Sequence, residues 1–363
     1  MKEKFEIPFS KPDISEEEIE AVLNVLKTGW PSQGKITEEF QNLLSNYLSS
    51  NVSVVNNGSS ALTSALIANG IKPGDKVIVP AFTYVATASI PKILGANVLV
   101  GDIDLDTLNM TPGHVEELIK NNDIKAIISV DVAGLPSDID GFIDIAKRNK
   151  IKLIEDAAQA FGSEYKNKKI GSFEHTTIFS FQITKQITTI EGGCVATTDE
   201  NIIKKINKIK DYGRSENGRY VHDFIGTNFR TTDLQSAIGK IQLKKIEKHI
   251  STRIQIAKEF ISKIKGVDFQ LIPNYVTRHS YLIFFALAKN SVERDEFIKN
   301  LIKNGIDARK AWVPIHRQPC FPEFQNLTCK NAENVYDRAF TLPLYNSMTM
   351  DESNLVINNC RND

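Results

Sequence analysis

The sequence carries no excess of charge of either sign, because 44 Lys and Arg residues balance 44 Asp and Glu residues along its 363 residues. Proteins that bind nucleic acid or an anionic membrane surface need a basic field, so we expect neither partner. A membrane span needs roughly 18 consecutive apolar residues, whereas the most apolar run, residues 281–288, is only as long as a buried strand. The N-terminal residues contain no apolar signal core, and we therefore expect a cytoplasmic location.

Cysteine and histidine are also sparse. The four cysteines form no CxxC pair and the six histidines form no HExxH motif, so the sequence predicts no metal site. Scattered cysteines in a reducing compartment also predict no disulfides. A chain with 41% hydrophobic and 24% charged residues is typical of a folded globular protein, and its length predicts two domains or one domain with an appendage.

Short apolar runs alternate with helical patterns through the first 210 residues. A helix with a capping box formed by Ser15 and Glu18 comes first. Apolar strands that alternate with helices predict a largely parallel sheet covered on both faces, and thus an α/β fold. The expected strands are 52–55, 77–79, 98–100, 126–130, 153–154, 177–181 and 194–197.

The second half of the chain is more helical. Residues 233–249 and 251–265 predict two consecutive long helices, and residues 281–287 predict a strand that opens another strand–helix unit. We therefore predict a large α/β domain in residues 1–245 and a smaller α+β C-terminal domain in residues 246–363. No long Pro- or Ser-rich linker separates them, so we expect them to pack as one body.

Three short segments contain residues suited to chemistry. Ser59 and Ser60 stand at a predicted helix start, where free N–H groups suit a phosphate, although either serine could simply cap the helix. Asp156 ends an apolar strand, where doubly wound sheets build their sites, although it could equally be a helix N-cap. Lys185 follows a later strand, and burial there would lower its pKa and favour a Schiff base, although most lysines are solvated surface charges.

In combination these segments supply what pyridoxal phosphate (PLP) requires. A helix start would fix the phosphate, Asp156 would keep the pyridinium nitrogen protonated, and Lys185 would bind the cofactor covalently. An aromatic residue should also cover the ring, and Tyr84 follows the expected strand 77–79. The alternative for Tyr84 is ordinary core packing.

The chain resembles the sugar-nucleotide aminotransferases of the DegT/StrS family, from about residue 8 to residue 345. This resemblance implies a type I PLP-dependent transferase fold with a mostly parallel sheet, and PLP as the cofactor. The segments that carry it occur in the family's order and spacing. They match the family's GTAAL, PSxTFVAT, EDAAQA and SFxxTKxITTGEGG motifs at residues 58–62, 80–87, 155–160 and 180–193.

The resemblance also implies roles for single residues. Lys185 would be the Schiff-base lysine and proton shuttle, Asp156 would pair with the pyridine nitrogen, and Gln159 would lie near the 3-hydroxyl of the ring. Asn228 would reach the phosphate of the neighbouring subunit's cofactor, which implies a homodimer with shared active sites. The other implied cofactor contacts are Gly58, Ser59, Ser60, Tyr84 and Ser180.

Three residues depart from the family pattern. Ile190 replaces the glycine of the TTGEGG segment, and Thr227 and Phe229 replace two tyrosines of the GYNYR segment at residues 226–230. None of them replaces the lysine or the aspartate, so we interpret them as bearing on the choice of substrate.

Residues 218–223 and 313–319 look closest to perosamine-synthase-like enzymes. These enzymes aminate C4 of a nucleotide-linked 4-keto-6-deoxyhexose, with L-glutamate as the amino donor. We therefore predict such an aminotransferase, serving amino-sugar and surface-glycan biosynthesis. The candidate contacts to the sugar or its diphosphate are Trp30, Arg219, His316 and Arg317, each of which could instead be a solvated or packed residue.

Other functions remain open from the sequence. A ketocyclitol aminotransferase would act on a substrate without a nucleotide, and a non-catalytic PLP-binding regulator would keep the cofactor but not the reaction. A sugar dehydratase is disfavoured, because relatives that dehydrate usually carry histidine at the position of Lys185. The nucleotide and the choice between C3 and C4 also stay open.

Overall fold

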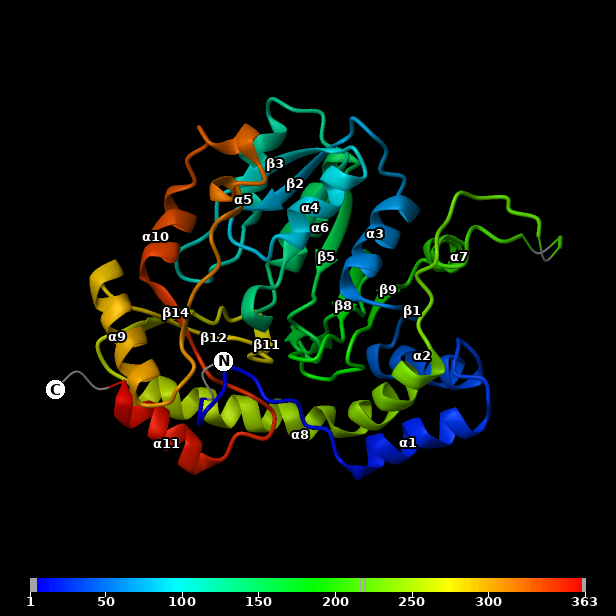
Figure 1. Cartoon of the computed structure of the whole chain (residues 1–363). Coiled ribbons are helices and arrows are strands. Elements are labelled where there is room, and N and C mark those ends of the chain that lie inside the picture. Colours follow the sequence, from blue (N-terminus) through cyan, green and yellow to red (C-terminus); the bar gives the residue numbers. More distant parts are fainter. Residues whose placement is uncertain (1–4, 216, 219, 361–363) are drawn as a thin grey trace.

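The computed structural model describes residues 5–360 except residues 216 and 219. Its centre is a seven-stranded sheet with the strand order β1-β9-β8-β5-β4-β2-β3 (Figure 1). Strand β9 runs antiparallel to both of its neighbours, and the remaining pairs are parallel. The largely parallel sheet predicted from the sequence is therefore confirmed. The strands are β1 (Asn51–Val55), β2 (Lys76–Pro80), β3 (Asn97–Gly101), β4 (Ala126–Val130), β5 (Lys152–Asp156), β8 (Thr176–Ser180) and β9 (Gly193–Thr197).

Helices cover both faces of this sheet, because successive apolar side chains of a strand point to opposite faces. In β2, Val77 and Val79 pack in the cluster that contains the apolar residues of α3 and α7, whereas Ile78 packs with those of α5 and α6. The helices of this domain are α2 (Lys35–Leu48), α3 (Gly58–Ala68), α4 (Ala86–Ile93), α5 (Pro112–Ile119), α6 (Ile139–Asn149) and α7 (Glu200–Ile209). The first helix, α1 (Glu16–Lys27), begins with the predicted Ser15–Glu18 capping box.

A single long helix, α8 (Asp233–Lys263), joins the two parts of the chain. The prediction of two helices divided at residue 250 is wrong, since neither glycine nor proline lies between residues 240 and 263 and Ile250 is buried. Figure 1 shows α8 running along the base of the molecule, beneath both the central sheet and the C-terminal strands. The proposed boundary at residues 245 and 246 lies within this helix, and the division into two domains stays a prediction.

The C-terminal part contains a four-stranded antiparallel sheet in the order β10-β12-β14-β13. The strand expected at 281–287 is shorter than predicted, because only residues 284–287 pair with β14. Among the described residues, no helix is both long and apolar enough to cross a membrane. The elements are β10 (Asp268–Phe269), β12 (Phe284–Leu287), α9 (Ser291–Lys303), β13 (Arg309–Lys310), α10 (Lys330–Arg338), β14 (Ala339–Leu342) and α11 (Met350–Asn359). A small third sheet consists of β6 (Glu164–Tyr165), β7 (Lys168–Lys169) and β11 (Val276–Arg278).

Ile190 lies in the turn between β8 and β9 with a φ of 69°, in the left-handed region that β-branched side chains disfavour. Its side chain is 47% exposed, so burial offsets little of this strain. Ile190→Gly should raise the free energy of unfolding by about 1 kcal/mol, because left-handed backbone costs a non-glycine residue roughly 1–2 kcal/mol and glycine returns part of that as chain entropy. Urea unfolding would measure it. Ile190→Ala should gain less, and a less stable glycine variant would contradict the prediction.

Candidate active site

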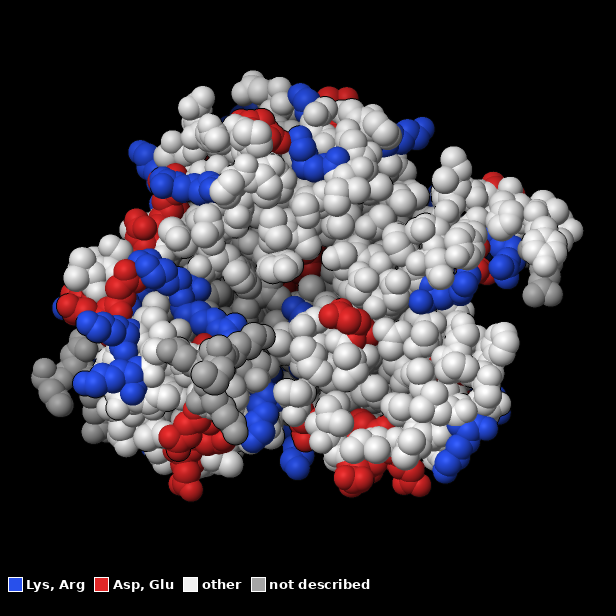
Figure 2. All heavy atoms as spheres, viewed as in Figure 1, with Lys and Arg blue, Asp and Glu red and all other residues white. Residues whose placement is uncertain are grey.

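A cavity of about 780 Å³ lies between the carboxyl ends of the central strands and the C-terminal sheet. Crevices of this kind, beyond the carboxyl ends of parallel strands, are where α/β folds bind ligands. Figure 2 shows the hollow near the centre of one face, with acidic and basic side chains at its floor. The segments after β1, β2, β5 and β8 line one side, and β12, β13 and the N-terminal residues Phe9 and Ser10 line the other.

The start of α3 forms an anion cradle at one end of the cavity. Asn57 is the N-cap, because its Oδ1 accepts a hydrogen bond from the Ser60 N–H at 2.8 Å. The alternative that Ser59 or Ser60 caps the helix is therefore wrong. A Cβ at Gly58 would lie only 2.8 Å from the Cβ of Ser180, so glycine allows the helix start to approach the end of β8. This approach brings Ser59 and Ser180 into one cavity wall, beside the positive end of the helix dipole.

Asp156 ends β5 with its side chain almost fully buried. Its Oδ2 accepts a hydrogen bond from the Thr87 hydroxyl at 2.8 Å, and its Oδ1 accepts one from the Ala158 N–H at 3.2 Å. No helix follows β5 directly, so Asp156 is not the helix cap that the sequence left open. Burial raises the pKa of Asp156, and these hydrogen bonds and the charge of Lys185 oppose that rise only in part. A cation placed against this carboxylate would therefore be strongly held.

Lys185 lies in the turn after β8 and faces the same cavity. Its backbone N–H donates to the carbonyl of Gln182 at 2.9 Å. Burial lowers the pKa of Lys185 to about 8, against the attraction of Asp156 and Glu191. At pH 7 roughly one molecule in ten would then carry a neutral amine, far more than for a solvated lysine. A neutral amine is the form that attacks a carbonyl carbon.

Two further predicted residues lie in the cavity wall. Tyr84 is 60% exposed, so the alternative that it packs in the core is wrong. Gln159 is buried, and its Oε1 accepts a hydrogen bond from the Ala133 N–H at 2.9 Å. The cavity thus brings together Gly58, Ser59, Tyr84, Asp156, Gln159, Ser180 and Lys185. The predicted contact Ser60 is buried, does not line the cavity and donates its N–H to Asn57.

The other predicted residues lie elsewhere in a single copy of the chain. Trp30 is 65% exposed in the loop between α1 and α2, and Asn228 is exposed on the segment that follows α7. His316 is buried and lies 2.9 Å from Glu333, which also binds Arg317 at 2.8 Å. None of these four lines the cavity. The remaining candidate, Arg219, lies outside the described residues.

Several cavity residues were not singled out from the sequence. Thr87 is the last residue of the motif at residues 80–87. Its hydroxyl lies three residues after Tyr84, and this spacing could have marked it as a second residue of the site. Arg309, Lys310 and Trp312 come from a two-residue strand and its following loop, where no motif marked them. Glu191, which also lines the cavity, attracts the charge of Lys185.

The residues present fit PLP. The donors at the start of α3 and at Ser180 match a phosphate, and the glycine at position 58 lets these two groups lie close together. Asp156 is a buried carboxylate whose raised pKa suits a protonated ring nitrogen, and Lys185 is an amine with a lowered pKa. An anion site, a buried carboxylate and an activated amine in one cavity are the protein groups that this cofactor needs.

Comparisons with known proteins agree with this geometry. The model of the DegT/DnrJ/EryC1/StrS aminotransferase family matches residues 12–361. The chain is 32% identical over 358 residues to the GDP-perosamine synthase of Caulobacter vibrioides, and the aligned region covers 97% of this chain and 96% of the relative. It is 33% identical over 350 residues to the GDP-perosamine synthase of Escherichia coli O157:H7, with 95% of each chain covered. The PLP form of the sugar aminotransferase Spr1654 from Streptococcus pneumoniae superposes with a TM-score of 0.90 at 28% identity, covering 98% of this chain and 97% of that one.

Proposed function

The chain belongs to the DegT/DnrJ/EryC1/StrS aminotransferase family, and from this premise we propose that it moves an amino group from L-glutamate to the C4 keto carbon of a nucleotide-linked 4-keto-6-deoxyhexose. Sugar aminotransfer with PLP is the activity of the family. The observation that carries the proposal is the single cavity that holds the anion cradle, Asp156 and Lys185. The two relatives named as GDP-perosamine synthases support C4 as the position and GDP as the first nucleotide to test.

When bound, PLP supplies an electron sink for the pair released at the carbon that gains or loses the amino group. Asp156 would hold the proton on the ring nitrogen, and the charge of that proton would in turn stabilise the buried carboxylate. Ser59, Ser180 and the N–H groups of α3 would fix the phosphate, so that the ring stays in register with Asp156. Lys185 would hold the cofactor covalently between turnovers and carry the proton to and from the reacting carbon.

The wall opposite the anion cradle would receive the substrates. Arg309 and Lys310 supply positive charge on β13, and Trp312 and Phe9 supply apolar surface. Arg309 binds Asp307 at 2.6 Å and lies over the Phe9 ring at 4.6 Å, so its guanidinium is already oriented before any ligand arrives. Such a wall suits the carboxylates of glutamate in one half-reaction and the diphosphate of a nucleotide sugar in the other.

A homodimer would complete the site. The segment that follows α7 extends away from the body of the chain (Figure 1) and carries Asn228 together with the apolar residues Val221, Phe224 and Ile225, the last of them 92% exposed. Apolar side chains in such a position are stabilised when a second protein covers them. In a two-fold dimer the same segment of each copy would reach the phosphate of the other, through Asn228.

The proposal predicts a spectroscopic change with the amino donor. L-Glutamate should bleach the visible band of the PLP-loaded protein and release 2-oxoglutarate, whereas D-glutamate should do neither, because only one enantiomer directs its α-proton to Lys185. The bleached protein should then recover its band with 4-keto-6-deoxyhexoses linked to GDP, dTDP or UDP. A band that L-glutamate leaves unchanged would contradict the donor. Recovery with a ketocyclitol alone would replace the sugar nucleotide as substrate.

A further inference from the structure

Gln186, the residue directly after Lys185, is fully buried and held at both its side chain and its backbone. Its Nε2 donates to the backbone carbonyl of Gln159 at 2.5 Å and to the Ser280 hydroxyl at 2.8 Å. Its own carbonyl accepts a hydrogen bond from Asn346 Nδ2 at 3.0 Å. The turn that carries Lys185 is therefore tied to Gln159 on one side and to the C-terminal segment on the other.

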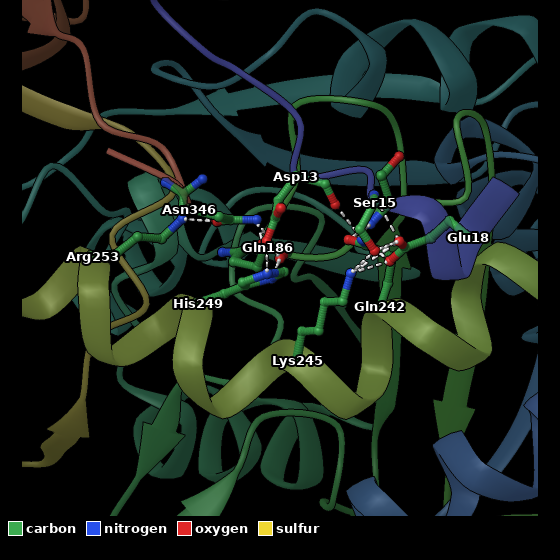
Figure 3. Close-up of polar contacts among 10 residues, drawn as sticks. Asp13, Ser15, Glu18, Gln186, Gln242, Lys245, His249, Arg253 and Asn346 are labelled. Atoms are coloured by element: carbon green, nitrogen blue, oxygen red, sulfur yellow. Dashed lines mark hydrogen bonds and ion pairs between the residues drawn. The ribbon is translucent and has the colours of Figure 1, made fainter. Parts of the chain in front are cut away.

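His249 is the remaining contact of the Gln186 carbonyl, and it comes from the middle of α8 (Figure 3). Its Nδ1 lies 3.0 Å from that carbonyl oxygen. Its Nε2 lies 2.9 Å from Oδ2 of Asp13, which belongs to the N-terminal segment of residues 5–14. A carboxylate only accepts hydrogen bonds, so Nε2 carries a proton, and the state of Nδ1 is what can change.

Arg253 determines how Nδ1 is used. Its Nε donates to Asn346 Oδ1 at 2.7 Å, which orients the Asn346 amide so that Nδ2 faces both the Gln186 carbonyl and Nδ1 of His249, the latter at 3.1 Å. A neutral His249 accepts from Asn346 at Nδ1. A protonated His249 instead donates from Nδ1 to the Gln186 carbonyl. The charged groups that face the ring are Asp13, which favours the cation, and Arg253, which disfavours it.

We propose that His249 is a positioning residue for Lys185, which acts by holding the carbonyl of Gln186, through Asn346 when the ring is neutral and directly when it is protonated, and so holds the backbone that aims the lysine into the cavity. The inference rests on the proposed role of Lys185 in cofactor binding. Asp13 fixes the tautomer of the ring, in the way that a carboxylate behind a catalytic histidine does. Phe9 and Ser10 of the same N-terminal segment line the cavity. This segment therefore contacts His249 through Asp13 and also forms part of the cavity wall.

Two substitutions of similar size separate positioning from mere stability. The amide nitrogen of His249→Asn lies near the place of Nδ1 and keeps a hydrogen bond to Gln186, but it loses Asp13. The amide of His249→Gln reaches the place of Nε2 and keeps Asp13, but it loses the contacts of Nδ1 with Gln186 and Asn346. Both variants bury a polar group in place of a ring, so a purely structural role would affect them alike.

The first readout uses the PLP-free protein. Competitive amine labelling at a series of pH values, read by mass spectrometry of the Lys185 peptide, gives the pKa of that lysine, which is about 8 in the native chain. His249→Gln should move it by roughly half a unit or more toward the ordinary value, because a loosened turn lets water reach the amine. His249→Asn should leave it close to the native value.

The second readout is the PLP-loaded protein. His249→Gln should weaken PLP binding and lower kcat, each about tenfold, with little change in KM, since a small misplacement of a catalytic group costs rate more than substrate binding. His249→Asn should recover most of both losses. Equal pKa values of Lys185 and equal PLP affinities in both variants and the native protein would overturn the inference.

The test separates the inference from the proposed function. A native protein without a visible PLP band would remove the proposed function, whereas the labelling of Lys185 would still report on His249. If His249→Gln does not fold, Asp13→Ala serves instead, because Asp13 is partly exposed and its substitution removes the acceptor of the Nε2 proton while leaving the buried ring in place. It should shift the pKa of Lys185 in the same direction by a smaller amount, and an unchanged pKa would overturn the inference.

Discussion

Replacing Lys185 with alanine is expected to abolish aminotransfer while leaving a folded protein that still binds PLP noncovalently. The anion cradle and Asp156 remain in this variant, so most contacts to the cofactor persist. It loses the only proton carrier that the proposal places at the reacting carbon, and positioned general acid–base groups contribute about 10²- to 10⁴-fold to rate. Turnover with L-glutamate and an active keto-sugar, assayed as 2-oxoglutarate release, measures the loss.

Stability supplies a second readout for Lys185→Ala. The unfolded chain keeps the lysine protonated up to its ordinary pKa, whereas the folded chain releases that proton near pH 8. The free energy of unfolding of the PLP-free native protein should therefore gain a contribution as the pH rises from about 8 toward 10.5, and the alanine variant should lack it. Lys204→Ala, at an exposed position on α7, is the matched control and should keep both activity and the native pH dependence. Full turnover by Lys185→Ala would remove the lysine from the mechanism.

The same variant tests the shared site. Each cofactor site of the proposed dimer would use Lys185 from one copy and Asn228 from the other. Mixed dimers of Lys185→Ala and Asn228→Ala would then contain one site with both defects and one site with none. Activity of the mixture above the sum of the two separate variants would support the dimer, and strictly additive activity would contradict it.

Short motifs picked out residues that line one cavity of the large domain, for a physical reason. The positions of Ser59, Asp156 and Lys185 follow from where a strand ends or a helix begins, and the carboxyl ends of parallel strands meet at one edge of the sheet. The choice between capping the helix and binding a ligand was decided by which side chain makes the capping hydrogen bond, and the sequence does not reveal this. Asn57 takes the cap of α3, which leaves the two serines beside it free of that role.

Cavity residues from the C-terminal half are positioned by contacts between segments far apart in the sequence, and they were not identified from the sequence. His316 and Arg317 were predicted to contact the sugar or its diphosphate, but both bind Glu333 of α10 outside the cavity of a single chain. Arg309 lies in the cavity wall because β13 pairs with β14, where Arg309 is opposite Thr341. A two-residue strand leaves almost no pattern in the sequence from which this could be predicted. The contact between His249 and the carbonyl of Gln186 likewise joins residues 63 positions apart.

Asp156→Asn is expected to lower kcat by about 10²- to 10³-fold, with a smaller effect on PLP affinity. The amide keeps the shape and the hydrogen bond from Thr87, although it loses the one from the Ala158 N–H. It cannot hold a proton on the ring nitrogen by charge, and removing one such electrostatic contact in a buried site costs about that much. Single-turnover bleaching of the PLP band by L-glutamate measures the effect on chemistry apart from product release.

Stability should move in the opposite direction to activity in this variant. Burial raises the pKa of Asp156, so the native PLP-free protein loses stability as the pH rises through that pKa, whereas an amide has no such loss. Asp156→Asn without PLP should therefore be at least as stable as the native protein at pH 7, by thermal unfolding. Asp131→Asn is the matched control, because this buried carboxyl directly follows the neighbouring strand β4, does not line the cavity and also has a raised pKa. It should keep native kcat. An Asp156→Asn enzyme with native kcat would mean that the carboxylate does not act on the ring nitrogen. Its role would then be limited to the hydrogen bonds that it accepts at the end of β5.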